Sequence, residues 1–189
     1  MDSSTNDYES TGRNSYKPND TLLTLNITYI LKSLIEENKN LYNYKEEISK
    51  QKNLIFFSKD IPSIPIKDYL YRIQLFTEAE DNTIILALIY LDKICEKASI
   101  ILSEYNIHKI LFVSILIAIK YNEDSFYDNK YYSQIAGVNL KELKKMESEF
   151  LRLIKFELYI NKNIFEKYKN YINRINTFNE MIKEKKFIL

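Results

Sequence analysis

Three charged residues interrupt otherwise apolar helical patterns, and they are the first candidates for a functional role. Lys120 directly follows the most apolar run of the chain, Glu147 falls on the apolar stripe of a later pattern, and Asp92 falls on the stripe of an earlier one. An unpaired charge at such a position costs several kcal/mol, so each must be paired or used in binding. Departures from binary patterning tend to mark functional or strained sites.

Each of the three charges has a structural and a functional interpretation. Asp92 is satisfied internally if Arg72, on the flank of the preceding helical pattern, forms an ion pair with it. Lys120 suits a helix C-terminus, where the dipole favours a cation by about 0.3–1 kcal/mol. Glu147 has no such support in mid-helix. The pattern therefore leaves open an internal Lys120–Glu147 pair and an exposed polar site for a partner.

Other residue types that carry chemistry are scarce. One histidine, His108, and one cysteine, Cys95, are too few for an ordinary zinc site, and both are interpreted as core or rim residues. A Cys–His nucleophile would also need a third group to orient it. Two glycines cannot form a phosphate-binding loop. We expect no enzymatic activity, metal, cofactor or small-molecule ligand.

Charge and hydropathy bear on the partners and the compartment. The 27 Lys and Arg residues balance 26 Asp and Glu residues and are interspersed with them, which argues against nucleic-acid or membrane-surface binding. The apolar run 110–119 is too short to span a bilayer. Residues 1–19 are polar, without the apolar core of a signal peptide, and a lone cysteine suits a reducing compartment. These features predict an intracellular protein, cytoplasmic or nuclear.

The elements that must position the charges are helices, because two glycines and three prolines leave little material for hairpins. Residues 1–19 are predicted to be disordered, and 20–60 to form a helical extension that starts with a cap at Asp20 or Thr21. Apolar spacing then predicts helices after Pro65, over about 81–97, 104–121, up to Ala136, from Leu140 and over about 162–176.

Local signals place several helix ends. Pro65 suits the first position of a helix, and Ser103 suits a cap. Gly137 supplies a left-handed stop, and Asn139 forms a capping-box-like start with Glu142. The helix over 104–121 is apolar on every face and must be surrounded by others. The predicted fold is all-α: five helices around this central third helix, with flanking N- and C-terminal helices.

Six segments, in order and at the right spacing, resemble the cyclin box. They are 65–73 (Pro-Ile-Lys-Asp-Tyr-Leu-Tyr-Arg-Ile), 86–94 (Leu-Ala-Leu-Ile-Tyr-Leu-Asp-Lys-Ile), 106–110 (Asn-Ile-His-Lys-Ile), 118–124 (Ala-Ile-Lys-Tyr-Asn-Glu-Asp), 132–138 (Tyr-Ser-Gln-Ile-Ala-Gly-Val) and 140–156. Their wording, with Glu-Asp-x-x-Tyr-x-Asn and Ala-Gly-Val, resembles the P-type (U-type) cyclins, the group of the yeast phosphate-sensing cyclin. The resemblance covers about residues 56–170.

This resemblance implies a single cyclin box over 61–160, followed by a C-terminal helix and tail over 161–189. It implies a non-catalytic subunit that binds a cyclin-dependent kinase as a heterodimer and activates it by holding the kinase C-helix in the active position. The alternative is a cyclin-box scaffold that binds a partner without activating a kinase. The Met-Arg-Ala-Ile-Leu patch that mitotic cyclins use to recruit substrates is not reproduced over 64–70.

The resemblance also assigns roles to individual residues. In cyclins, the lysine that closes the third box helix and the glutamate of the Met-Glu pair in the fifth contact the kinase, and these correspond to Lys120 and Glu147. The apolar neighbours expected beside them are Phe150, Phe126 and Tyr127. The aspartate of the Tyr-x-Asp motif pairs in the family with an arginine of the first box helix, which implies an Asp92–Arg72 pair.

Overall fold

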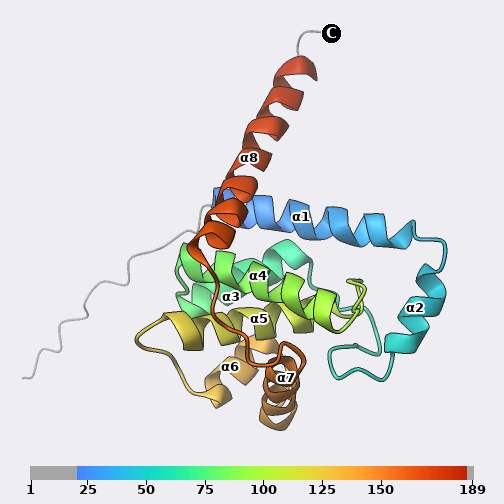
Figure 1. Ribbon diagram of the computed structural model, residues 1–189, viewed down its shortest axis with the longest axis vertical. Helices are drawn as coiled ribbons and strands as arrows, with labels where there is room; N and C mark the ends of the chain where they lie inside the picture. The colour runs from blue at the N-terminus through green and yellow to red at the C-terminus, as the bar shows by residue number, and fades with distance from the viewer. Residues whose placement is uncertain (1–20, 187–189) are drawn as a thin grey trace, which may run out of the picture.

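The computed structural model describes residues 21–186 and, for side chains, residues up to 175 (Figure 1). The described residues form eight helices and no strand, which confirms the predicted all-α class. The helices are α1 (Leu22–Lys39), α2 (Tyr44–Gln51), α3 (Ile66–Thr77), α4 (Asp81–Lys97), α5 (Ile107–Asn122), α6 (Asn129–Ala136), α7 (Leu140–Leu153) and α8 (Lys162–Lys186). The predicted disordered segment 1–19 lies outside the described residues.

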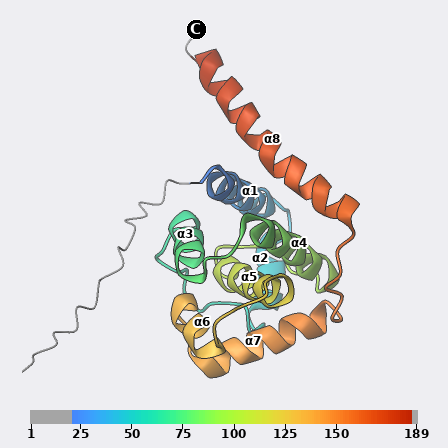
Figure 2. The ribbon, with the colours of Figure 1, turned by 90° about the vertical axis from the view of Figure 1, so that its left-hand side faces the viewer.

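Helix α5 is the hub of the bundle. Every residue from Ile110 to Ile119 is buried, including the small Ser114, whose hydroxyl donates to the carbonyl of Ile110 at 2.8 Å. Figure 2 shows α5 enclosed by α3, α4, α6 and α7. A helix that is apolar on all sides is stable in water only when neighbours cover every side, as here.

Helix ends follow the predicted signals in some places and differ in others. Gly137 stops α6 with φ 74°, and the Asn139 side chain caps α7 by accepting from the backbone N–H of Glu142 at 2.9 Å. Pro65 is the cap residue of α3 and not its first residue. Helix α5 starts three residues later than expected: its cap residue is Asn106, whose side chain accepts from the backbone N–H of Ser103.

The N-terminal helix α1 lies across the bundle beside α8. Its Asn26 is buried and donates to the carbonyl of Ile172 in α8 at 3.0 Å, and its Thr24 donates to Gln74 of α3 at 2.6 Å. A buried amide needs such partners, so these bonds fix how α1 sits on its neighbours. Helix α8 starts where predicted but continues ten residues further, and it projects away from the bundle (Figure 1).

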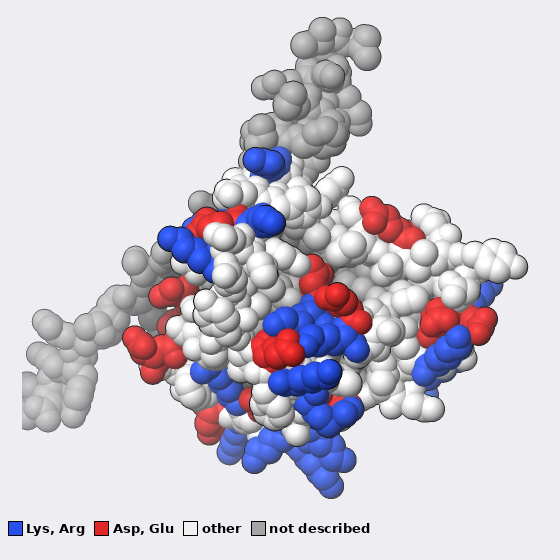
Figure 3. Space-filling model, in the orientation of Figure 1, with Lys and Arg blue, Asp and Glu red and all other residues white. Residues whose placement is uncertain are grey.

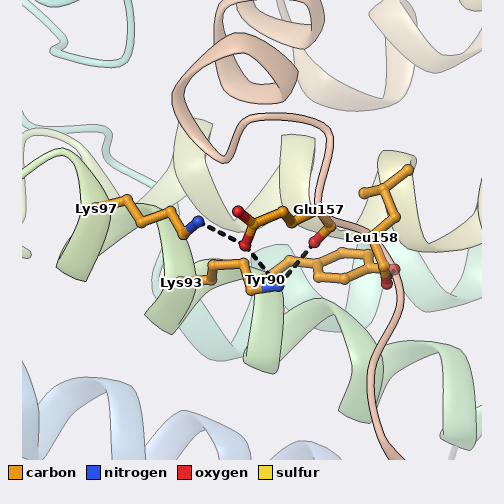
Figure 4. Close-up of polar contacts among 5 residues, drawn as sticks. All are labelled: Tyr90, Lys93, Lys97, Glu157 and Leu158. Carbon is orange, nitrogen blue, oxygen red and sulfur yellow. Dashed lines mark hydrogen bonds and ion pairs between the residues drawn. The ribbon is translucent and has the colours of Figure 1, made fainter.

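The segment between α7 and α8, here called the strap, runs over the surface of α4 (Figure 4). Tyr90 donates to the carbonyl of Leu158, and Lys93 to the carbonyl of Glu157, both at 2.7 Å. Lys97 pairs with the Glu157 carboxylate at 2.5 Å. Three side chains of one helix face thus hold the strap that leads the chain into α8.

Candidate functional site

Lys120, Asn129 and Glu147 meet at the surface in a closed ring of hydrogen bonds, here called the triad. The Lys120 ammonium lies 2.5 Å from Oε1 of Glu147 and 2.6 Å from Oδ1 of Asn129. The Asn129 amide closes the ring by donating to Oε2 of Glu147 at 2.9 Å. Of the two interpretations that the sequence left open, the internal Lys120–Glu147 pair is thus present, with Asn129 as a third member between the two charges.

Three helix ends and caps position the triad. Lys120 lies in the last turn of α5, where the helix dipole favours a cation. Asp128 caps α6 by accepting from the backbone N–H of Tyr131 at 2.8 Å, which fixes Asn129 as the first helical residue. The Asn139 cap sets the start of α7, and Glu147 lies two turns further along. Short-range signals thus bring together groups from three separate helices.

The triad is partly exposed. Relative exposure is 25% for the Lys120 side chain and 16% for that of Glu147. Met146, the residue before Glu147, is buried in the core. Because the charges keep contact with water while being paired, the arrangement avoids the full desolvation cost of a buried ion pair and remains accessible to a partner.

Exposed aromatic side chains lie in the chain segment that leads into the triad. Phe126 is 53% and Tyr127 45% exposed, so two of the three predicted apolar neighbours are at the surface. The ring of Tyr127 packs on Tyr131 with centroids 4.4 Å apart, and the Tyr131 hydroxyl donates to the carbonyl of Phe76 at 2.9 Å. These contacts tie the α5–α6 segment to the end of α3.

A hollow of about 530 Å³ lies along the same segment. It is lined by the aromatic pair Phe126 and Tyr127 and by four carboxylates, those of Glu78, Glu80, Glu123 and Asp124. One of these already has a structural role, since Glu123 accepts from the backbone N–H of Glu80 at the start of α4. By contrast, Figure 3 shows lysines and arginines gathered at the α7 end of the molecule.

Phe150 does not belong to this surface. It is fully buried, and its ring meets Phe56 edge-on with centroids 6.2 Å apart. The expectation that Phe150 contacts a partner is therefore wrong: it lies on the apolar stripe of α7 that faces the core, one turn after Met146. Its role is to anchor α7 and the segment before α3 to each other.

The predicted Arg72–Asp92 ion pair is also wrong. Arg72 donates to the carbonyl of Gln134 at 3.0 Å and so links α3 to α6. Asp92 accepts from the hydroxyl of Tyr168 in α8 at 2.5 Å. Asp92 is exposed, not on a buried stripe, because the part of α4 that carries it faces a groove beside α8. Although part of Asp92 is in contact with water, the groups packed around its carboxyl partly desolvate it and raise its pKa, and the hydrogen bond from Tyr168 acts in the opposite direction.

His108 and Cys95 lie in or near the core, as interpreted from the sequence. His108 is buried and bonded through Nε2 to the carbonyl of Ile64 at 2.8 Å, and burial lowers its pKa. Burial, with the nearby Asp92 charge, raises the pKa of the Cys95 thiol to about 12. A thiol with such a pKa is unreactive near neutrality. The described residues include no cluster of three or more potential metal ligands.

Sequence reasoning missed Asn129 and Tyr131. Asn129 directly follows the capping aspartate and closes the Glu-Asp-x-x-Tyr-x-Asn segment, so the motif contained the signal. An amide offers both a donor and an acceptor, which is what a bridge between a cation and a carboxylate requires. Tyr131 carried no signal, because aromatic residues are frequent in this segment.

Comparison with known proteins decides the family. A family model described as Cyclin matches residues 21–158, which cover most of the chain. The chain belongs to the cyclin family. The match begins with α1, so it includes the N-terminal helices as well as the five that surround and include α5.

Individual relatives place this cyclin with the U-type and P-type groups, as its sequence motifs predicted. Cyclin-U2-2 of Arabidopsis thaliana is 36% identical over 128 residues, covering 67% of this chain and 56% of the relative. Cyclin-U2-1 of the same plant is 33% identical over 166 residues, covering 85% and 73%. PHO85 cyclin-7 of Saccharomyces cerevisiae is 28% identical over 174 residues, covering 82% and 61%. The chain thus spans between about half and three quarters of these relatives' lengths.

Across the described residues, no helix of this cyclin combines the length and the hydropathy that a membrane crossing requires.

Proposed function

We propose that this cyclin is a non-catalytic regulatory subunit that binds a cyclin-dependent protein kinase through the surface around the triad. The observation that carries the proposal is the triad itself, a partly exposed pair of opposite charges, with the exposed aromatics Phe126 and Tyr127 shortly before Asn129 in the chain. Charged groups bordered by apolar side chains are typical of interface hot spots. The family and the name of the yeast relative, a cyclin of PHO85, support a kinase as partner.

The proposed mechanism is differential binding. A kinase is active only when the glutamate of its C-helix pairs with the catalytic lysine. A cyclin that binds the inward position of that helix more tightly than the outward one shifts the population toward the active state. In this proposal the box over 61–160 supplies the contacts, and helices α1 and α2 before it brace it.

The test combines charge reversal with a charge swap. Lys120→Glu alone breaks both the internal ring and the proposed contact. The double change Lys120→Glu with Glu147→Lys restores opposite charges, and the Asn129 amide can turn over to serve both. We expect the double variant to melt near the wild-type temperature and yet fail to co-purify with a cyclin-dependent kinase or to stimulate its activity.

Lys97→Glu is the matched control, because it reverses another lysine that lies 2.5 Å from a glutamate, on the strap side of α4. It should leave kinase co-purification unchanged. Recovery of kinase binding in the double variant would show that the pair is purely structural. If the wild-type chain recovers no cyclin-dependent kinase, the proposed function fails. A kinase that is bound without gaining activity would favour the scaffold alternative.

A further inference from the structure

A groove between α1, α4 and α8 lies apart from the triad. It has a volume of about 310 Å³, at the lower end of the range of about 300–1,000 Å³ typical of ligand sites. Its walls are mainly apolar: Ile30 and Leu34 come from α1, Leu88 from α4, and Ile172 from α8. Figure 2 shows these three helices on the side of α5 opposite to α6 and α7, which carry two members of the triad.

The groove contains a carboxylate, that of Asp92, for which no ion-pair partner is found among the described residues. Asp92 and Glu37 are its only charged lining residues within the described part of the chain, and both are acidic. The carboxylate of Asp92 accepts one hydrogen bond, from Tyr168, and has no lysine or arginine within ion-pair distance among the described residues. A carboxylate offers about four acceptor positions, so most of the capacity of Asp92 is unused.

Apolar surface continues beyond the groove along α1. Leu22, Leu25 and Tyr29 follow one another at helical spacing, and each is at least 40% exposed. Tyr171 of α8, which also lines the groove, is 59% exposed. Figure 3 shows few charges on the surface along α1 to the right of the base of α8. Exposed apolar side chains next to an apolar groove mark interaction sites, and a groove between helices can hold an extended or helical peptide.

We propose that this groove binds a peptide segment of a partner protein in which one lysine or arginine is flanked by apolar residues. The apolar side chains would lie against the walls formed by α1 and α8, and the cation would bind Asp92. Tyr29 and Tyr171 offer aromatic faces to the same cation. Charge complementarity selects this occupant, because an acidic segment would meet two carboxylates and an uncharged one would leave Asp92 unpaired.

This inference does not depend on the proposed kinase contact, since α3, α5, α6 and α7 contribute no lining residue to the groove. The experiment therefore uses the full chain alone. A phage-displayed library of random nine-residue peptides is selected on the immobilised wild-type chain and counter-selected on Asp92→Lys. We expect enriched sequences that carry a lysine or arginine between apolar residues.

A synthetic peptide from the enriched set is then titrated by fluorescence anisotropy. Asp92→Asn removes the charge but keeps an acceptor for Tyr168, and it should weaken binding at least about tenfold. Glu96→Gln, one turn further along α4 and outside the groove, is the matched control and should leave affinity unchanged. A peptide with glutamate in place of its cation should lose affinity for the wild-type chain and regain it with Asp92→Lys.

Thermal melting of each variant checks that the fold is intact. Lys120→Glu should bind the peptide like the wild type, so that failure of the kinase proposal and failure of this one can be told apart. The inference is overturned if no peptide is enriched, if the enriched peptides lack a cation, or if Glu96→Gln weakens binding as much as Asp92→Asn. A concentration-dependent dimer abolished by Asp92→Lys would assign the groove to a second copy and also overturn it.

Discussion

The triad presents a partner with a nearly neutral but strongly polar surface. Lys120 uses two of its three ammonium donors within the ring, and each Glu147 oxygen keeps a free acceptor position. A kinase that covers the triad would exclude water and lower the local dielectric, which strengthens the existing ion pair. Binding would then need only the remaining donor and acceptors to find partners, without separating the two charges.

At the residue scale, Phe150 and Phe126 are predicted to behave in opposite ways. Phe150→Ala leaves a cavity in the core and should lower the free energy of unfolding by roughly 3–5 kcal/mol. Phe126→Ala removes a half-exposed ring and should change it by no more than about 0.5 kcal/mol. Urea denaturation followed by circular dichroism measures both. A stable Phe150→Ala variant would contradict the position of this ring in the core.

At the element scale, short polar caps decide where the site residues point. Asp128 caps α6 directly before Asn129, the triad residue of that helix. The Asn139 cap sets the register of α7, which carries Glu147. A shift of one residue in either helix would turn the triad side chain by about 100°, since an α-helix has 3.6 residues per turn. The stop at Gly137 separates the two helices and keeps both registers independent.

The glycine stop yields a prediction. Gly137 adopts φ 74°, with open space where a side chain would start. Gly137→Ala therefore costs backbone strain alone, and should lower the free energy of unfolding by about 1 kcal/mol. Gly137→Asn should cost less, because asparagine tolerates the left-handed conformation. Chemical denaturation of the two variants side by side provides the comparison, and an equal loss would point to a cause other than φ.

Much of this arrangement of elements could be predicted from the sequence. Local rules sufficed for the Gly137 stop and the Asn139 cap, because both depend on a few neighbouring residues. The start of α5 was misplaced because Ser103 and Asn106 are both residue types that cap helices, and the hydrogen bonds that the Asn106 side chain makes to Ser103 and Ile101 cannot be read from local sequence. The length of α8 was underestimated.

The site was less predictable than the fold. Spacing identified Lys120 and Glu147 as charges that interrupt apolar patterns and left their internal pairing open, and it could not show that an amide from a third helix joins them. Asp92 was assigned a partner in α3, whereas its partner is in α8, 76 residues later in the chain. Contacts between residues so distant in sequence depend on how helices cross, which apolar periodicity does not encode.

At the scale of the whole molecule, two faces have different characters. The face of α6 and α7 carries two members of the triad, and the face of α1, α4 and α8 carries the groove with Asp92 (Figure 2). Helix α5, which is buried from Ile110 to Ile119, lies between them. Distant sites without shared contacts usually act additively. The two proposed partners would therefore bind at separate faces of the molecule.

Global stability should depend on pH through His108. Burial lowers its pKa below the usual value of about 6.5, so the stability that this neutral ring provides is complete above about pH 6.5 and is lost as the pH falls towards the folded-state pKa. Since His108 is the only histidine, His108→Gln should flatten the decline between about pH 7.5 and 5.5. Denaturation midpoints across this range test it, and parallel curves for both proteins would contradict it.

The strap is held mainly by side chains of α4 that bind the main chain of the strap. Two of its bonds to α4 are accepted by main-chain carbonyls, those of Glu157 and Leu158, which every amino acid possesses. Tyr90 and Lys93, by contrast, supply side-chain donors that few other residues can replace. Substitutions of Glu157 and Leu158 thus keep the two hydrogen bonds to their carbonyls. Substitutions of Tyr90 and Lys93 remove these bonds and loosen the segment that leads into α8. The position of α8 therefore depends on side chains of α4 that lie more than sixty residues before α8 in the sequence.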